Sequence, residues 1–307
     1  MRVLFAGTPQ VAVPALAALL ASDHEVVGVL TRADAASGRG RKLTPSPVRV
    51  AAQAAGLPVI TAKPADPDFA PAIRALDAEI AAVVAYGHLL KPAILAVLPF
   101  GWLNLHFSLL PAWRGAAPVQ HAIIAGDSVT GASVFLLDEG MDTGPVYASI
   151  GEPIGPDDTT GTLLDRLAVS GAELLVGVIS QIAAGQLTPV PQVGVPILAP
   201  KLNPPDAQVD WTQPAIVIDR LIRGCTPAPG AWTTLPDGLR LGLAPGKIRP
   251  DVAGLAPGEM QIGKQAVLVG TGSVAVELGL VRPVGKQPMA AEDWARGARL
   301  PAEVRLG

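Results

Sequence analysis

The sequence of 307 residues contains a single cysteine, Cys225. One cysteine excludes an internal disulfide and any zinc or iron–sulfur site built from several thiolates. Proteins without disulfides are typical of reducing compartments, so we expect a cytoplasmic location.

Long apolar runs are also missing. No stretch of 18 or more apolar residues occurs, so we expect neither a transmembrane helix nor a membrane partner. Arg2 and the apolar residues after it imitate a secretory signal. Gly7-Thr8-Pro9-Gln10 divides that run into one piece of strand length and one of helix length, which favours a folded N-terminus.

Aromatic residues and positive charge are scarce. Aromatic side chains make up 4% of the chain, and the formal net charge is −3. A general nucleic-acid binder normally has a basic balance, and a single-strand binder has aromatic platforms for stacking. Any contact with a polyanion must therefore come from a local basic patch.

The common cofactor motifs are absent as well. Gly7-Thr8-Pro9-Gln10 stands where a G-x-G-x-x-G fingerprint would follow the first strand, and no G-x-x-x-x-G-K-[ST] occurs. The four histidines form no H-E-x-x-H or other close ligand pair. These absences argue against nicotinamide dinucleotide, nucleoside triphosphate and metal sites.

The first half of the chain alternates strand-like and helix-like segments. The pattern predicts strands at 3–6, 26–30, 59–60, 80–84 and 102–106, with helices at 13–20, 47–55 and 69–75. Strands that are apolar on both faces and separated by helices predict an α/β fold with a doubly wound, mostly parallel, Rossmann-like sheet. Ligands bind such sheets at the carboxyl ends of the strands, here after Ala6, Leu30, Val84 and His106.

The second half predicts a different architecture. A second sheet-like hairpin is expected at 132–137 and 146–150, followed by a long helix at 162–184. Short alternating runs from Gly230 onward are typical of a small β-barrel. We predict a catalytic domain over 1–188, a proline-rich linker over 189–205 and an OB-like barrel domain over 206–307.

Asn104 and His106 are the first candidates for chemistry. Residues two apart in a strand point the same way, so an amide and an imidazole would lie side by side. The amide can stabilise an oxyanion, and the imidazole can exchange a proton near neutral pH. Spacing alone favours a simpler alternative, two polar side chains that satisfy hydrogen bonds at a strand end.

A glycine-rich loop, residues 138–145, carries three carboxylates. An aspartate from this loop could pair with His106 and orient its ring. Composition alone favours an ordinary hairpin turn here, because aspartate and glycine are common turn residues.

Together, these segments resemble a known family. Asn104-x-His106 with Ser108-Leu109-Leu110-Pro111, then Arg114-Gly115-Ala116-Ala117-Pro118, then 138–144, are similar to the signature of the folate-dependent formyltransferases, and in particular those that act on methionyl-tRNA. The resemblance covers nearly the whole chain and overturns both simpler alternatives. It implies a catalytic trio of Asn104, His106 and Asp142, with 10-formyltetrahydrofolate as cosubstrate and no metal.

The resemblance also implies a mechanism. The α-amino group of methionyl-initiator tRNA attacks the formyl carbon, and Asn104 and protonated His106 stabilise the oxyanion of the tetrahedral intermediate. Asp142 orients the imidazolium and helps a water carry the proton to the leaving folate. The folate pocket is expected in the turn after the preceding strand, with His88 contributing through its backbone. The expected folate-binding residues are Tyr86, Gly87, His88, Leu89, Leu90, Ser108, Leu109, Leu110, Pro111 and Asp138.

A basic loop, residues 38–49, resembles the segment by which these enzymes reach the acceptor stem of tRNA. Its four positive charges have no acid between them and suit phosphates, although charge alone equally suits a solvated loop. The expected tRNA contacts are Arg39, Arg41, Lys42, Arg49 and, in the linker, Lys201. We expect a monomer whose partners are initiator methionyl-tRNA and folate.

Two alternatives and one departure from the family pattern remain. The chain could be a formyltransferase for a small amine, such as an amino-sugar nucleotide, or a tRNA-binding module without catalysis. The segment Cys225-Thr226-Pro227-Ala228-Pro229-Gly230 lacks the tryptophan that the family usually has between its prolines. This departure concerns an aromatic packing contact and not the catalytic trio.

Overall fold

The computed structural model describes residues 1–37, 42–298, 300 and 303–307. The chain divides into two compact units. Unit 1 comprises Met1–Pro118, Val129–Pro153 and Leu164–Ala199, and unit 2 comprises Val119–Ser128, Ile154–Leu163 and Pro200–Gly307.

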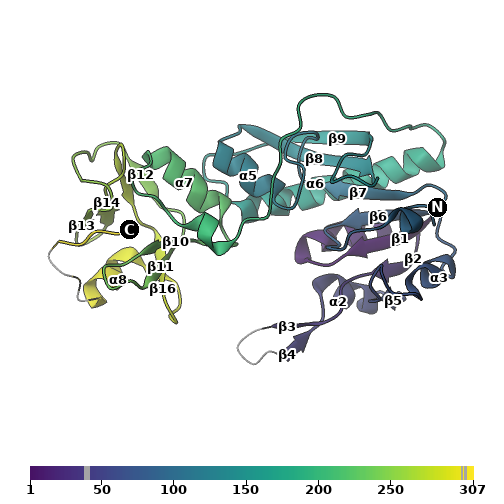
Figure 1. Cartoon of the computed structure of the whole chain (residues 1–307), viewed down its shortest axis with the longest axis horizontal. Coiled ribbons are helices and arrows are strands. Elements are labelled where there is room, and N and C mark those ends of the chain that lie inside the picture. The colour runs from purple at the N-terminus through teal and green to yellow at the C-terminus, as the bar shows by residue number, and fades with distance from the viewer. Residues whose placement is uncertain (38–41, 299, 301–302) are drawn as a thin grey trace. The chain divides into compact units, whose positions relative to one another are not determined.

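Unit 1 is built on a seven-stranded sheet of order β5-β2-β1-β6-β7-β8-β9 (Figure 1). Its strands are β1 Arg2–Gly7, β2 Glu25–Leu30, β5 Val59–Ile60, β6 Ile80–Val84, β7 Trp102–His106, β8 Val129–Leu136 and β9 Val146–Pro153. The first five strands in that order are parallel, and β8 and β9 are antiparallel to their neighbours. This arrangement confirms the predicted mostly parallel sheet. The hairpin predicted at 132–137 and 146–150 extends this sheet, because β8 pairs with β7.

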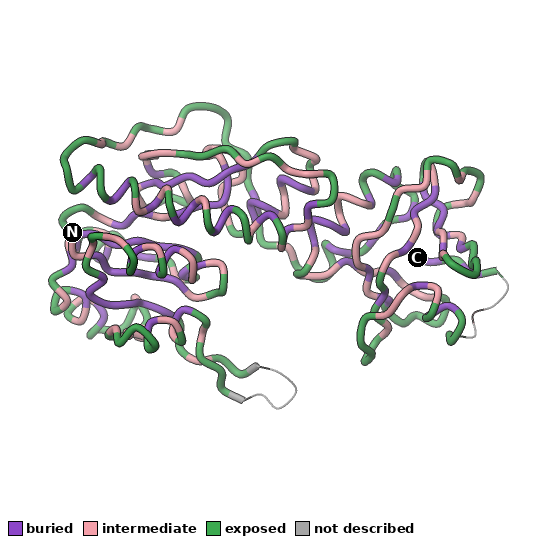
Figure 2. The backbone as a smooth tube through the Cα atoms, turned by 180° about the vertical axis from the view of Figure 1, so that it is seen from behind, coloured by how far each residue is buried: buried purple, intermediate pink, exposed green. Residues whose placement is uncertain are grey.

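The core of unit 1 lies along these strands. The strands β1, β6 and β7 are buried almost throughout, as the purple segments of Figure 2 show. Buried apolar side chains on both sides of a strand explain the unbroken apolar runs in the sequence. The helices of unit 1 are η1 Gln10–Ala12, α1 Val13–Leu20, α2 Pro47–Ala54, α3 Phe69–Arg74, α4 Pro92–Leu95 and most of α6 Thr160–Ala183, whereas α5 Pro118–Ala125 belongs to unit 2 except for its first residue.

Helix α2 begins where its sequence predicts. Ser46 caps it by accepting a hydrogen bond from the Arg49 N–H, and Pro47 occupies the first turn. Between β2 and α2, the short strands β3 Ala35–Ser37 and β4 Lys42–Thr44 form a hairpin that projects from unit 1 (Figure 1). The second of these strands, Lys42–Thr44, belongs to the predicted basic loop 38–49.

The strand order reverses next to β1. β2 and β5 lie on one side of β1, and β6 and β7 lie on the other. At such a switch point the loops that leave the two central strands diverge, which opens a crevice at the carboxyl edge. Here the Thr8 hydroxyl, just after β1, donates to the Tyr86 carbonyl oxygen after β6 at 2.9 Å.

Unit 2 contains two four-stranded antiparallel sheets, β10-β11-β16-β17 and β12-β15-β14-β13. Trp211, Ile222 and Trp294 are among the side chains of its apolar core. These sheets agree with the predicted domain of short antiparallel strands. The described strands of unit 2 form no closed barrel, so the OB-like topology itself stays a prediction. The elements of unit 2 are η2 Pro204–Ala207, α7 Ala215–Gly224, β10 Ala231–Thr234, β11 Arg240–Leu243, β12 Lys247–Arg249, β13 Met260–Ile262, β14 Val267–Val269, β15 Ala275–Glu277, β16 Leu280–Pro283, β17 Met289–Ala290 and α8 Ala291–Gly297.

Candidate active site

Strand β7 carries both side chains of the predicted Asn-x-His pair. They lie two residues apart and therefore on one face of the strand. Asn104 is half-buried, and its amide makes no hydrogen bond with any residue that the structure describes. His106 is 6% exposed. The site thus combines an unengaged amide with a buried imidazole.

The His106 ring is held by a main-chain carbonyl. Its Nε2 lies 2.9 Å from the Trp113 carbonyl oxygen, and because a carbonyl only accepts, Nε2 carries a hydrogen. Its Nδ1 lies 3.7 Å from Asp142 Oδ2, within ion-pair range but too far for a hydrogen bond. Nδ1 is therefore the ring atom whose proton can be exchanged. Sequence reasoning expected Asp142 to orient the ring and missed Trp113, because a carbonyl leaves no trace in a motif.

The position of Asp142 is set by a main-chain hydrogen bond and by its own backbone conformation. Its Oδ2 accepts the Gly115 N–H at 2.8 Å, and its backbone is left-handed, with φ of 53°. Gly115 has a φ of 125°, and a Cβ there would lie 2.7 Å from the Ala199 carbonyl oxygen. Both conditions require glycine at this position. The structure thus brings Asp142 to His106 through the Arg114-Gly115 turn.

The loop of Asp142 reaches His106 by folding back. β8 is antiparallel to β7, and Leu137, just after β8, donates its N–H to the Trp102 carbonyl oxygen at the far end of β7 from His106. Asp138 stabilises the turn by which the loop reverses direction. Its Oδ1 accepts hydrogen bonds from the Gly140 N–H at 3.0 Å and from the Thr143 hydroxyl at 2.7 Å. Asp138, predicted to bind folate, therefore shapes the loop with one of its oxygens.

The predicted linker begins with a segment that lines this site. Residues 189–199, called the strap below, form reciprocal hydrogen bonds between Val190 and Val146 and bond to Arg114 through Ile197 and Ala199. The Gln192 amide donates to the carbonyl oxygens of Asp142 and Gly144. Sequence reasoning missed Gln192, because an isolated glutamine among prolines matches no motif.

The predicted folate loop after β6 divides into exposed and buried parts. Gly87 is left-handed with a φ of 82°, and Leu89 is 82% exposed. The side chains of Tyr86 and Leu90 instead pack into the apolar core. Tyr86 therefore faces the loop with its backbone only, and the accessible part of the predicted pocket narrows to residues 87–89.

His88 lies beside two cations. Burial, followed by the charges of Arg32 and Lys63, lowers the pKa of its imidazole. A histidine with a lowered pKa is neutral at pH 7. Its ring therefore adds no charge to the predicted folate loop.

We expect Tyr86→Phe to leave the free energy of unfolding unchanged or to raise it by about 1 kcal/mol. The Tyr86 side chain is 2% exposed and its hydroxyl has no hydrogen-bond partner among the described residues, so burial costs free energy without compensation. Burial also raises the pKa of Tyr86 to about 12. Urea denaturation measures the change, with half-buried Tyr147→Phe as control. A loss of more than about 1 kcal/mol would contradict an unpartnered hydroxyl.

The turn after β7 is held by hydroxyl groups. Ser108 is buried; its hydroxyl donates to the Ala112 carbonyl oxygen at 2.6 Å, and its own carbonyl accepts from the Ser133 hydroxyl at 2.7 Å. Ser108, predicted to bind folate, therefore has its side chain committed to the turn. The other predicted residues of this turn, Leu109, Leu110 and Pro111, are half-buried.

The predicted tRNA contacts are only partly described. Arg39 and Arg41 lie outside the described residues, and for Lys42 only the backbone, in β4, is described. Arg49 Nη1 lies 2.7 Å from Asp34 Oδ1, so its charge is paired with an acid that precedes the loop. Lys201 is exposed and follows the strap.

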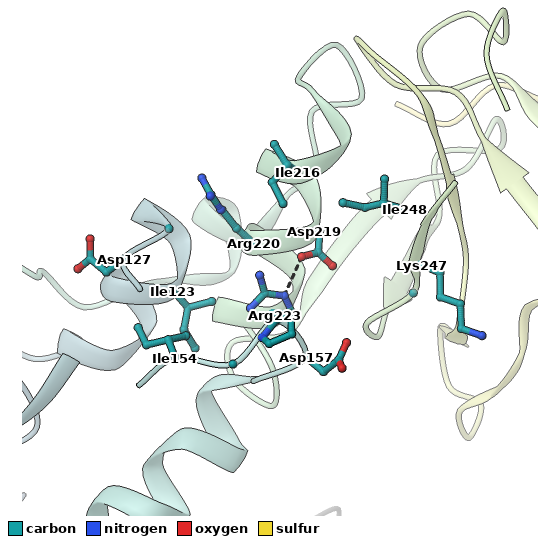
Figure 3. Close-up of a pocket in the computed structure, with 14 residues that line it drawn as sticks. Ile123, Asp127, Ile154, Asp157, Ile216, Asp219, Arg220, Arg223, Lys247 and Ile248 are labelled. Carbon is teal, nitrogen blue, oxygen red and sulfur yellow. Dashed lines mark hydrogen bonds and ion pairs between the residues drawn. The ribbon is translucent and has the colours of Figure 1, made fainter. Parts of the chain in front are cut away.

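A cavity of about 430 Å³ lies within unit 2 and contains none of the predicted site residues (Figure 3). Arg223 Nε and Asp219 Oδ2, 2.7 Å apart, form an ion pair on its wall. Its charged lining residues balance in sign: Arg220, Arg223 and Lys247 against Asp127, Asp157 and Asp219. The lining therefore carries no excess of positive or negative charge that would select a charged ligand.

Among the described residues, no group of three or more histidine, cysteine or carboxylate side chains is placed to hold a metal ion. No helix in the described ranges is both long and apolar enough to cross a membrane.

Comparison with known proteins gives a consistent result over the whole chain. Residues 1–179 match the formyl transferase family, and residues 201–299 match the formyl transferase C-terminal domain. The chain is 56% identical to the methionyl-tRNA formyltransferase of Streptomyces coelicolor, with all of both chains covered. It is equally identical, at 56%, to the Thermobifida fusca enzyme of that name, covering 100% of this chain and 99% of the relative.

A solved structure shares the fold. HypX from Aquifex aeolicus in complex with tetrahydrofolic acid matches with a TM-score of 0.68 at 17% identity, over 96% of this chain and 46% of HypX. The chain thus spans about half of HypX, but the full length of the relatives in sequence. On the identity and coverage of those relatives, the chain belongs to the methionyl-tRNA formyltransferase family of enzymes.

Proposed function

We propose that this enzyme transfers the formyl group of 10-formyltetrahydrofolate to the α-amino group of methionyl-initiator tRNA. The observation that carries the proposal is the meeting of Asn104, His106 and Asp142 in a chain whose full-length relatives are named for this reaction. The cosubstrate supplies an activated formyl carbon. The chain must therefore stabilise the developing oxyanion and move one proton.

His106 and Asn104 act on the formyl oxygen. As the amine adds to the carbonyl carbon, the Asn104 amide and the Nδ1–H of protonated His106 donate to the oxyanion. The hydrogen bond from Nε2–H to Trp113 holds the ring in place, and the Asp142 carboxylate lies 3.7 Å from Nδ1.

The proton balance assigns a second task to Asp142. A bond forms between the methionine nitrogen and the formyl carbon, the bond from that carbon to the folate nitrogen breaks, and the amine proton moves to that nitrogen. Asp142 accepts one hydrogen bond from Gly115 and retains lone pairs to hold a water that carries this proton.

The folate site lies at the switch point of the sheet. Residues 87–89 offer main-chain groups and one exposed apolar side chain, Leu89, next to the turn after β7. A small number of polar groups beside an apolar surface suits a ring system such as a pterin. The loop therefore fits the cosubstrate mainly through its backbone.

The tRNA is held by two regions. The basic loop 38–49 reaches the acceptor stem, and the domain over 206–307, acting as an OB-like module after the linker 189–205, binds the tRNA body. The catalytic domain spans 1–188. The protein functions as a monomer, with Lys201 contacting the acceptor arm.

We expect Arg41→Ala with Lys42→Ala to raise the KM for methionyl-tRNA and leave the KM for folate unchanged. Loss of two phosphate contacts reduces the slope of log KM against log salt by about 1 to 2. Steady-state kinetics at several salt concentrations measure both effects. Arg74→Ala, which removes an exposed cation on α3, is the control. An unchanged KM for tRNA would remove the loop from the interface.

A formylation assay tests the function itself. Initiator and elongator methionyl-tRNA are compared side by side with 10-formyltetrahydrofolate, and we expect transfer to the initiator only. Transfer to an amino-sugar nucleotide, with none to methionyl-tRNA, would instead assign a small-amine acceptor. Saturable tRNA binding without turnover would assign a binding module.

A further inference from the structure

The strap passes the candidate active site with its side chains largely exposed. From Val190 to Leu198 every residue is exposed except Gln192, which is half-buried. Exposed prolines and valines in this stretch account for its extended course but not for its closeness to the site. The glutamine is therefore the side chain of this stretch that needs an explanation.

All the hydrogen-bonding capacity of the Gln192 amide is used. Its Nε2 donates to the carbonyl oxygens of Asp142 and Gly144, both at 2.8 Å. Its Oε1 accepts from Arg114 Nε at 3.1 Å and Nη2 at 2.7 Å. Carbonyls only accept and a guanidinium only donates, so the amide has a single possible orientation.

These hydrogen bonds hold the loop at Asp142, the candidate catalytic residue. The loop folds back from the far end of β7, and Asp142 adopts a left-handed backbone that non-glycine residues rarely adopt. Gln192 binds the two carbonyls that flank Thr143, while Arg114, its other partner, precedes the Gly115 that donates to Asp142 Oδ2. One amide thus ties together both segments that set the distance from Asp142 to His106.

We propose that Gln192 is a positioning residue for catalysis, which holds Asp142 at its working distance from His106. It does not touch the reactants and acts through Asp142. The inference rests on the proposed function for the reaction that is measured, but the geometry it describes can be tested without that reaction.

Gln192→Glu separates this role from general packing. A glutamate has the same size and keeps an acceptor for Arg114, but it places an oxygen against the two carbonyls that now receive hydrogen bonds. Gln186→Glu makes the same change at an exposed glutamine shortly after α6 and is the matched control. Both variants add one negative charge, so a difference between them reflects the contacts of Gln192.

A double-mutant cycle with Asp142→Asn tests whether Gln192 acts through Asp142. We expect Gln192→Glu to lower kcat for formyl transfer about 10- to 100-fold in the wild-type background. In the Asp142→Asn background we expect a further loss of less than about 3-fold, because coupled residues are not additive. An equal loss of kcat in both backgrounds would overturn the proposal, because a packing defect would lower kcat by the same factor with or without the Asp142 carboxylate.

Amide exchange provides a readout that needs no activity. The Gly115 N–H donates to Asp142 Oδ2, so its exchange rate, measured by NMR on the full chain, reports whether that contact persists. We expect exchange at Gly115 to accelerate at least about 10-fold in Gln192→Glu and to stay unchanged in Gln186→Glu. An unchanged rate in Gln192→Glu overturns the inference. Absence of formyl transfer in the wild type would count against the proposed function alone.

Discussion

Replacing His106 by alanine is expected to lower kcat for formyl transfer by about 10³-fold or more, with KM values for both substrates changed only a few-fold. The variant loses the Nδ1 group that the proposed mechanism places on the formyl oxygen, and it removes the imidazole that lies 3.7 Å from Asp142 Oδ2. The ring is anchored by a hydrogen bond to a carbonyl and not through the ladder of β7, so its removal leaves the backbone of β7 paired as before. Steady-state kinetics of formyl transfer measure the loss.

Another histidine provides the control for this experiment. His24 is half-buried in the same unit and bonds to Ser180 at 3.0 Å, without any part in the candidate active site. We expect His24→Ala to retain wild-type kcat. A His106→Ala enzyme with kcat within 10-fold of the wild type would sink the proposed mechanism, because neither proton exchange nor oxyanion stabilisation at Nδ1 could then be important.

Replacing Gly115 by alanine is expected to lower kcat/KM about 10²-fold. A Cβ at this position would lie 2.7 Å from the Ala199 carbonyl oxygen, and the φ of 125° is unfavourable for any L-residue. The turn must shift, and with it the N–H that holds Asp142 Oδ2. A displacement of about 1 Å in a reacting group is enough for a loss of this size.

The control must share the backbone cost but not the contact. Gly56 also has a positive φ, 70°, and nothing lies within 4 Å of the Cβ that alanine would add. Both variants should lose about 1 to 3 kcal/mol of stability from backbone strain, as denaturant unfolding will show. Only Gly115→Ala should lose activity beyond the unfolded fraction. Equal activity of the two variants would separate Gly115 from the site.

The sheet of unit 1 was largely predictable because its signal is local. The strands expected at 80–84 and 102–106 coincide with β6 and β7, since buried parallel strands have unbroken apolar runs with turn residues at their ends. The hairpin of β8 and β9 was also expected, but its place in the sheet was not. Apolar periodicity marks a strand and not the neighbour with which it pairs.

The grouping of the three candidate catalytic residues was predictable only in part. Asn104 and His106 are close in sequence, so strand geometry alone places them together. Asp142 follows a strand that runs away from His106. The residues alone suggested only that some aspartate of its loop could pair with His106, and the family resemblance singled out Asp142. The folate contacts of Tyr86 and Ser108 stay predictions, and the structure adds only that their side chains are directed into the core and into a turn.

By itself, the sequence determined which groups are available and which chemistries are excluded. The single cysteine excluded an internal disulfide, the absence of nucleotide and metal motifs argued against such sites, and the Asn104-x-His106 strand supplied the amide and the imidazole. Only the tertiary structure decided how these groups are held. Trp113 contributes a carbonyl, Gly115 an N–H and Gln192 an amide from the expected linker. Contacts of this kind depend on main-chain positions brought together by the fold, and main-chain atoms are the same in every residue, so no local pattern in the sequence records them.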